Sequence, residues 1–209
     1  MPKFIKIIKF LFELLRCSPH LIIFCLHKNK SIIKADIERW KQVLNIKYPI
    51  HVALIYLLCF QKAFRNVFYY RIGVFKYFLN IFCPQISSLI ILTPNIGEGL
   101  FIWIGFSTAI GAKSIGKNCM INHQVTIGNQ NGYPTILDNV RIHAGAIIFG
   151  DITIGNNAII GANATVFKDV PDNCTVYSES SRIIKWSDEF YPKFSDNSII
   201  QDEKTDNNH

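Results

Sequence analysis

An aliphatic residue recurs every six positions through the second half of the chain, and this period constrains the fold more than any other feature. The uninterrupted part of the series consists of Ile136, Ile142, Ile148, Ile154, Ile160 and Val166. A six-residue unit is too short for a helix pair or a hairpin, but it accommodates one short strand and one corner. The pattern therefore predicts a parallel β-helix in which three units form each coil and the aliphatic side chains point inward.

Two irregular steps upstream indicate how the coils align. Ile102 and Ile121 are nineteen residues apart, and Ile121 and Ile142 are twenty-one apart, against eighteen for three regular units. The first step adds one residue, and the second adds three, which we place in a loop over residues 130–135. The sequence thus predicts that Ile102, Ile121, Ile142 and Ile160 stack in one column.

This register brings His123 and His143 to the same corner of adjacent coils. They are the only histidines between residues 93 and 185, and successive coils rise by about 4.8 Å. An imidazole that titrates near neutrality is suited to general acid–base catalysis. We predict that His123 is the base and that His143 is a second catalytic residue. The alternative is that both are solvent-exposed corner residues without a catalytic role.

Four segments of the repeat region resemble the hexapeptide-repeat acyltransferases, in particular the serine-acetyltransferase-like enzymes. They are INHQVTIGN (121–129), ILDNVRIHAGA (136–146), GDITIG (150–155) and KDVPDN (168–173). Residues 61–73 resemble the helical segment before the repeats in the same group, and the nearest resemblance is to enzymes of exopolysaccharide and colanic acid biosynthesis. The resemblance implies a left-handed β-helix, a homotrimer or dimer of trimers, and acetyl-CoA as co-substrate.

The resemblance also implies roles for individual corner residues. The acceptor is expected to contact Trp103, Asn122 and Tyr133. Coenzyme A is expected along small corners that admit its pantetheine arm, and near a lysine for its phosphates: Ala144, Gly145, Gly161, Ala162 and Lys168. Ile104 replaces the family's catalytic histidine, and Trp103 replaces the acid before it. We therefore expect the role of base to have passed to His123, one coil later.

The function that we predict is acetyl-CoA-dependent O-acetylation of a sugar hydroxyl in surface polysaccharide biosynthesis. Two alternatives stay open: a serine O-acetyltransferase of cysteine biosynthesis, and a catalytically silent β-helix scaffold. A metal enzyme of the γ-carbonic anhydrase kind would need three histidine ligands per zinc, and the repeats hold two. The six cysteines form no CxxC pair, which favours reduced thiols over a zinc site. We therefore expect no metal.

Charge and composition divide the chain. Residues 1–94 hold 14 Lys/Arg, 3 Asp/Glu and one glycine. Residues 95–209 hold 8 Lys/Arg, 12 Asp/Glu and eleven glycines. We predict a basic helical domain at 1–92, with helices over 32–45 (Ser31 as N-cap) and 50–70, an acyltransferase β-helix at 93–185, and a polar tail at 186–209. No apolar run reaches the roughly 18–20 residues of a membrane span. We expect a cytoplasmic protein without a nucleic-acid partner; peripheral contact of the basic half with the inner membrane face stays open.

Overall fold

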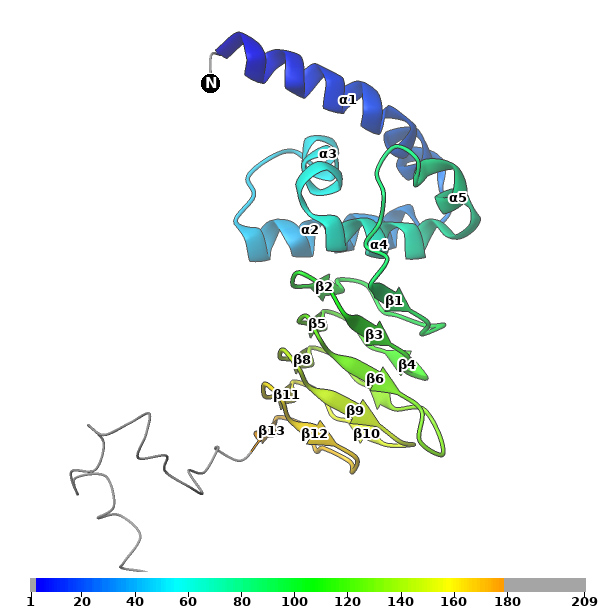
Figure 1. Cartoon of the computed structure of the whole chain (residues 1–209), viewed down its shortest axis with the longest axis vertical. Helices are drawn as coiled ribbons and strands as arrows, with labels where there is room; N and C mark the ends of the chain where they lie inside the picture. The colour runs from blue at the N-terminus through cyan, green and yellow to red at the C-terminus, as the bar shows by residue number, and fades with distance from the viewer. Residues whose placement is uncertain (1–2, 179–209) are drawn as a thin grey trace, which may run out of the picture. The chain divides into compact units, whose positions relative to one another are not determined.

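The structure, a computed structural model, describes residues 3–178, with side chains from residue 12 onward. Its helices precede thirteen strands in this part of the chain, and the coils of strands stack away from the helical end (Figure 1). The helices are α1 (Lys3–Leu26), α2 (Lys30–Leu44), α3 (Ile50–Phe60), α4 (Lys62–Ile72), the 3₁₀ turn η1 (Gly73–Phe75) and α5 (Lys76–Leu79). No helix within the described range is long and apolar enough to cross a membrane.

The helical segment differs from the sequence prediction in two local details. Asn29, and not Ser31, is the N-cap of α2. The helix predicted over residues 50–70 is divided, because Gln61 leaves the helical conformation (φ −112°, ψ 88°) between α3 and α4. Residues on both sides of Gln61 have good helical spacing, so the periodicity of apolar residues does not reveal the break.

All strands of the repeat region pair in parallel and form three faces. The first face contains β1 (Leu89–Ile91), β3 (Thr108–Ile110), β6 (Thr126–Gly128), β9 (Ile147–Phe149) and β12 (Thr165–Val166). The second contains β4 (Ser114–Ile115), β7 (Thr135–Ile136) and β10 (Thr153–Ile154). The third contains β2 (Phe101–Ile102), β5 (Met120–Ile121), β8 (Arg141–Ile142), β11 (Ile159–Ile160) and β13 (Thr175–Val176).

The predicted isoleucine column is confirmed by the register of the third face. Ile102 pairs with Ile121, Ile121 with Ile142, and Ile142 with Ile160. All four side chains are buried in the interior of the prism, where removing one would cost roughly 2–5 kcal/mol. A helical segment followed by a parallel solenoid is the predicted fold class, and the pairing is that expected of a left-handed β-helix of hexapeptide repeats.

The helical segment is attached to the first coil through a buried ion pair. Arg71 of α4 donates from Nε to Asp36 of α2 at 2.8 Å. Its two other nitrogens donate to the carbonyl oxygens of Ile96 and Gly97, each at 2.6 Å. Asp36 also accepts the backbone N–H of Leu100 at 3.2 Å. These contacts fix the helical segment against the coil that precedes the candidate site.

The first strand, β1, begins at Leu89, inside the range predicted for the helical domain, and pairs with β3. Residues 3–178 fall within one compact unit. The predicted boundary at residue 185 and the predicted polar tail lie outside the described residues.

Candidate functional site

His123 and His143 lie at the corner where the third face turns into the first. His123 is the second residue after Ile121, and His143 is the first residue after Ile142, so the two are offset by one position between adjacent coils. Both are half-buried. No hydrogen bond joins the two rings in the described part of the chain. The structure thus brings the two histidines to one corner, as the register implies, without a direct contact between them.

The ring of His123 stacks on Phe106, with 5.1 Å between ring centroids and 16° between ring planes. Its Nδ1 is buried and has no hydrogen-bond partner among residues 3–178. The stack fixes the plane of the imidazole, while no neighbour selects its tautomer. Phe106 is absent from the predicted site, and a lone phenylalanine in a turn carries no sequence signal for this contact.

The loop that carries Phe106 has an unusual backbone. Ile104, Gly105 and Ser107 all have positive φ, of 67°, 76° and 50°. A β-branched residue in this region is a conformational outlier, and such residues cluster at functional sites. This loop holds two residues more than a regular unit, because Ile102 and Ile110 are eight positions apart, and the next corner is one residue short, so the coil gains one residue in all. Ile104 therefore holds a strained conformation at the position where the resemblance places the family's histidine.

A cavity of about 720 Å³ lies between this loop and the helical segment. It is lined by both sides of the break between α3 and α4, including Gln61 and Lys62, by the segment from Pro84 to Ser87, and by Ile104 and Phe106. The cavity reaches His123 only through Phe106. Its lining residues include a lysine and an arginine but no acid, so its charge suits an acceptor with a carboxylate.

The three predicted acceptor contacts do not lie together within one chain. Trp103 and Asn122 follow β2 and β5, at the corner of the histidines. Tyr133 belongs to the loop between β6 and β7 and approaches Gly111, between β3 and β4. That corner joins the first and second faces. Tyr133 could therefore meet an acceptor bound near Trp103 only from a neighbouring subunit, and its role stays a prediction.

Four of the predicted coenzyme A residues lie at the histidine corner, on the coil of His143 and on the next coil: Ala144, Gly145, Gly161 and Ala162. Lys168 instead follows β12, at the corner that joins the first and second faces. Gly145 (φ 73°) has its side-chain space occupied by the side chain of Asn163, and a Cβ on Gly161 would lie 2.8 Å from the carbonyl oxygen of Val176. The fold itself therefore requires both glycines. Ala162 is exposed and Ala144 half-buried, while Lys168 is exposed with its Nζ 5.8 Å from the centre of the Phe167 ring. Coenzyme A binding at these residues stays a prediction.

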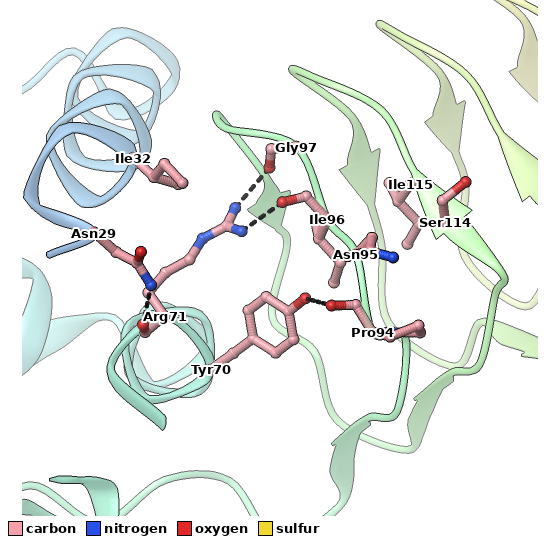
Figure 2. Close-up of a pocket in the computed structure, with 10 residues that line it drawn as sticks. All are labelled: Asn29, Ile32, Tyr70, Arg71, Pro94, Asn95, Ile96, Gly97, Ser114 and Ile115. Atoms are coloured by element: carbon pink, nitrogen blue, oxygen red, sulfur yellow. Dashed lines mark hydrogen bonds between the residues drawn. The ribbon is translucent and has the colours of Figure 1, made fainter. Parts of the chain in front are cut away.

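A second hollow, of about 540 Å³, lies where α2 and α4 meet the first coil (Figure 2). Its polar side chains serve the junction itself. Arg71 is bound to Asp36 and to backbone carbonyls, Tyr70 donates to Pro94 O at 2.9 Å, and Asn29 donates to Arg71 O at 2.8 Å. With these groups already paired, the histidine corner and its cavity form the better candidate site.

Comparison with known proteins finds similarity in the repeat region. A family model described as bacterial transferase hexapeptide (six repeats) matches residues 133–168. A serine acetyltransferase of Synechococcus elongatus is 42% identical over 96 residues, which make up 43% of this chain and 39% of that protein. A serine acetyltransferase of Bacillus pumilus is 38% identical over 119 residues, or 52% of this chain and 55% of that protein. The matches thus span about half the length of these relatives or less.

Solved structures extend the similarity into the helical segment. Neisseria gonorrhoeae serine acetyltransferase in complex with serine has a TM-score of 0.58 and 27% identity, covering 77% of this chain and 71% of that one. The Brucella abortus serine acetyltransferase has the same TM-score and identity, covering 74% and 68%. The chain is therefore similar to hexapeptide-repeat acyltransferases of the serine acetyltransferase kind.

This similarity overturns the predicted acceptor. The sequence favoured a sugar hydroxyl and enzymes of exopolysaccharide biosynthesis, whereas the relatives and structures named above are serine acetyltransferases. The prediction was wrong because it gave more weight to a few corner residues, above all Trp103 and Ile104, than to similarity along the whole repeat region. The alternative, serine as acceptor, is the better-supported one.

Proposed function

We propose that this protein is an acetyl-CoA-dependent serine O-acetyltransferase. The observation that carries the proposal is the similarity to a serine acetyltransferase solved with serine, which covers 77% of this chain and so includes part of the helical segment as well as the coils. The cavity beside Phe106 adds independent support, because Lys62 gives it a positive charge suited to the carboxylate of an amino acid.

In this proposal His123 is the base. The serine hydroxyl attacks the thioester carbon, a C–O bond forms, and the hydroxyl proton passes to His123. The C–S bond then breaks, and the proton neutralises the departing thiolate of coenzyme A. Backbone N–H groups at the corner stabilise the oxyanion that forms between these steps. His143, one coil further, orients His123 or contacts the acceptor.

The proposed site is complete only in an oligomer. Tyr133 extends from a different corner of the prism, so it reaches the acceptor of an adjacent copy. Coenzyme A lies along Ala144, Gly145, Gly161 and Ala162, and Lys168 of an adjacent copy, at the same corner as Tyr133, lies near its phosphates. We therefore propose a trimer, or a dimer of trimers, in which neighbouring prisms share each site.

The test is acceptor-dependent release of coenzyme A. Purified protein is mixed with acetyl-CoA and L-serine, D-serine, L-threonine or no acceptor, and the free thiol and the acetylated product are quantified. The proposal expects O-acetyl-L-serine, formed faster with L-serine than with the other acceptors. No thioester cleavage at all would instead favour the silent scaffold, and cleavage without acceptor dependence would contradict the proposal as hydrolysis.

A further inference from the structure

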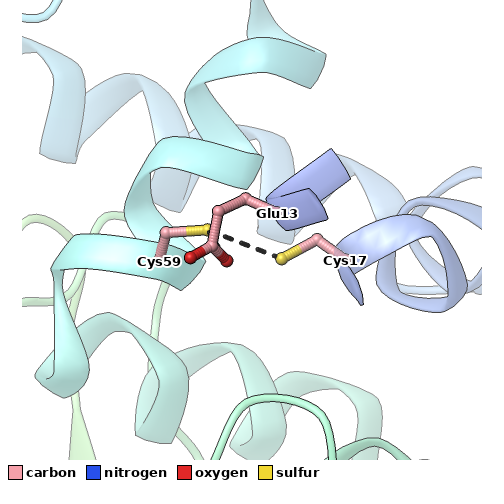
Figure 3. A group of neighbouring side chains, drawn as sticks. All are labelled: Glu13, Cys17 and Cys59. Carbon is pink, nitrogen blue, oxygen red and sulfur yellow. Dashed lines mark hydrogen bonds between the residues drawn. The ribbon is translucent and has the colours of Figure 1, made fainter. Parts of the chain in front are cut away.

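Three cysteines from distant parts of the chain meet in the helical segment. Cys17 of α1 lies with its Sγ 3.7 Å from the Sγ of Cys59 of α3 and 3.7 Å from that of Cys83, which follows α5. The Sγ of Cys59 lies 3.3 Å from a carboxylate oxygen of Glu13, one turn before Cys17. Figure 3 shows Glu13, Cys17 and Cys59 converging from α1 and α3, and their ligating atoms all lie within 4.8 Å of one another.

The spacing fits a tetrahedral zinc ion. A Zn–S bond of about 2.3 Å in a tetrahedron places two sulfur ligands about 3.8 Å apart. The thiol pairs that include Cys17 are at 3.7 Å, so only a small adjustment would admit the ion between Cys17, Cys59 and Glu13. Cys83 lies outside that group of three, but its Sγ is 3.7 Å from that of Cys17, which makes it the nearest candidate for a fourth ligand.

Two arginines balance the negative charge of such a ligand set. Arg16 forms an ion pair with Glu13 and lies 3.7 Å from the Sγ of Cys59. The buried Arg65 donates to the carbonyl oxygens of Cys59 and Pro84, at 3.0 and 2.8 Å. Arg65 thus supplies positive charge and also holds the backbone beside two of the cysteines, as the outer partners of metal ligands do.

Only three of the six cysteines belong to this cluster. The three other cysteines are Cys25, which is exposed on α1, and Cys119 and Cys174, which belong to the repeats. A hydrogen bond also fixes the backbone of Cys83, because its carbonyl oxygen accepts from the hydroxyl of Tyr69 at 2.8 Å. The cluster therefore combines thiols with a carboxylate, the donor types that zinc takes in proteins.

We propose that Glu13, Cys17 and Cys59, with Cys83 as fourth ligand, bind one Zn²⁺ ion that ties α1 to α3 and to the segment after α5. This reverses the expectation that the cysteines form no zinc site, since the positions 17, 59 and 83 carry no recognisable spacing. The proposal is independent of the acetyltransferase activity, because the site lies in the helical segment.

The direct test is metal content and cobalt substitution. Protein purified without chelator is expected to hold about one zinc per chain, and the apo-protein titrated with Co²⁺ should show thiolate-to-cobalt charge-transfer absorption. Cys17→Ser and Cys59→Ser should lose both signals, while the matched control Cys25→Ser, on the same helix as Cys17, keeps them. Zinc should also raise the Tm of the wild type but not of Cys17→Ser.

A second measurement uses only the wild type, so it tests the proposal even if the cysteine variants do not fold. In the wild-type apo-protein, zinc should slow alkylation of Cys17, Cys59 and Cys83, read by mass spectrometry of peptides, and leave alkylation of Cys25 unchanged. The proposal is overturned if Co²⁺ gives no thiolate absorption with the wild type. It is equally overturned if the isolated protein contains a disulfide from Cys17 to Cys59 or Cys83, or if Cys25→Ser loses the metal.

Discussion

At the scale of single residues, the repeat region joins a regular pattern to one irregular loop. The hexad period predicts where His123 lies, because each inward isoleucine sets the corner residues that follow it. The period says nothing about Phe106, whose stack on His123 depends on positive φ at Ile104 and Gly105. Positive φ at a β-branched residue opposes its local preference. For this reason, no local rule predicts the conformation of this part of the site.

A buried histidine in the helical segment makes stability depend on pH. His20 is completely buried, with Nε2 2.9 Å from the Tyr69 hydroxyl. Burial, together with the charges of Arg16 and Arg65, lowers the pKa of His20 to about 4. In the unfolded chain the pKa of a histidine is about 6.5, so between about pH 6.5 and pH 4 only the unfolded chain binds the proton. The free energy of unfolding is therefore highest above about pH 6.5 and falls as the pH drops.

We expect protonation of His20 in the unfolded chain to lower the free energy of unfolding by about 3 kcal/mol between about pH 7.5 and pH 4. His20→Gln retains a partner for the Tyr69 hydroxyl but cannot be protonated. We therefore expect the free energy of unfolding of His20→Gln, measured with urea at both pH values, to fall by about 3 kcal/mol less than that of the wild type. Equal losses in the two proteins would mean that His20 is protonated in the folded state.

At the scale of elements, the sequence predicts the coils much better than the helical segment. An inward residue every six positions specifies both strand register and face, so the isoleucine column follows from counting. The helices depend on contacts between residues far apart in the chain. The ion pair of Asp36 and Arg71 joins positions 35 residues apart, and the sequence alone does not distinguish the buried Asp36 from the half-buried Glu38. The sequence does not reveal the cluster of Cys17, Cys59 and Cys83 either, because these residues are also far apart in the chain.

The junction between α2, α4 and the first coil depends on Asp36. Asp36→Asn would leave the guanidinium of Arg71 buried without a counter-charge, and breaking such a pair typically costs 3–5 kcal/mol. Glu38→Gln, on the same helix, is the matched control, because it removes only an ion pair to Lys41 at the surface, worth at most about 1 kcal/mol. Chemical denaturation of the three proteins measures both changes. Equal stabilities of Asp36→Asn and Glu38→Gln would show that the junction does not need the pair.

At the scale of the whole molecule, the first face presents two exposed isoleucines. Ile90, Ala109, Thr126, Ile147 and Thr165 occupy one outward register column, in which Ile90 and Ile147 are 48% and 40% exposed. The chain has a mass of 23.9 kDa. Light scattering is expected to give a trimer of about 72 kDa, or twice that mass, from this subunit mass.

A charge on this face tests where the subunits meet. We expect Ile147→Glu to dissociate the assembly, because a carboxylate buried in an apolar contact is costly. Thr153→Glu places the same charge on the exposed second face and should leave the mass unchanged. A wild-type monomer at micromolar concentration would exclude the shared site, and a trimeric Ile147→Glu would place the contact elsewhere.

The most direct test of the account is the turnover number of His123→Ala with acetyl-CoA and L-serine. Loss of a positioned general base should lower kcat by about 10²–10⁴. Coenzyme A affinity should change little, because the His123 ring stacks on Phe106 and its contact with Gly145 is made by the backbone carbonyl, which the substitution keeps. His143→Ala should cost less, and His51→Ala, an exposed histidine of α3, should behave as the wild type. A His123→Ala enzyme with wild-type kcat would contradict the account, because the base would then lie elsewhere.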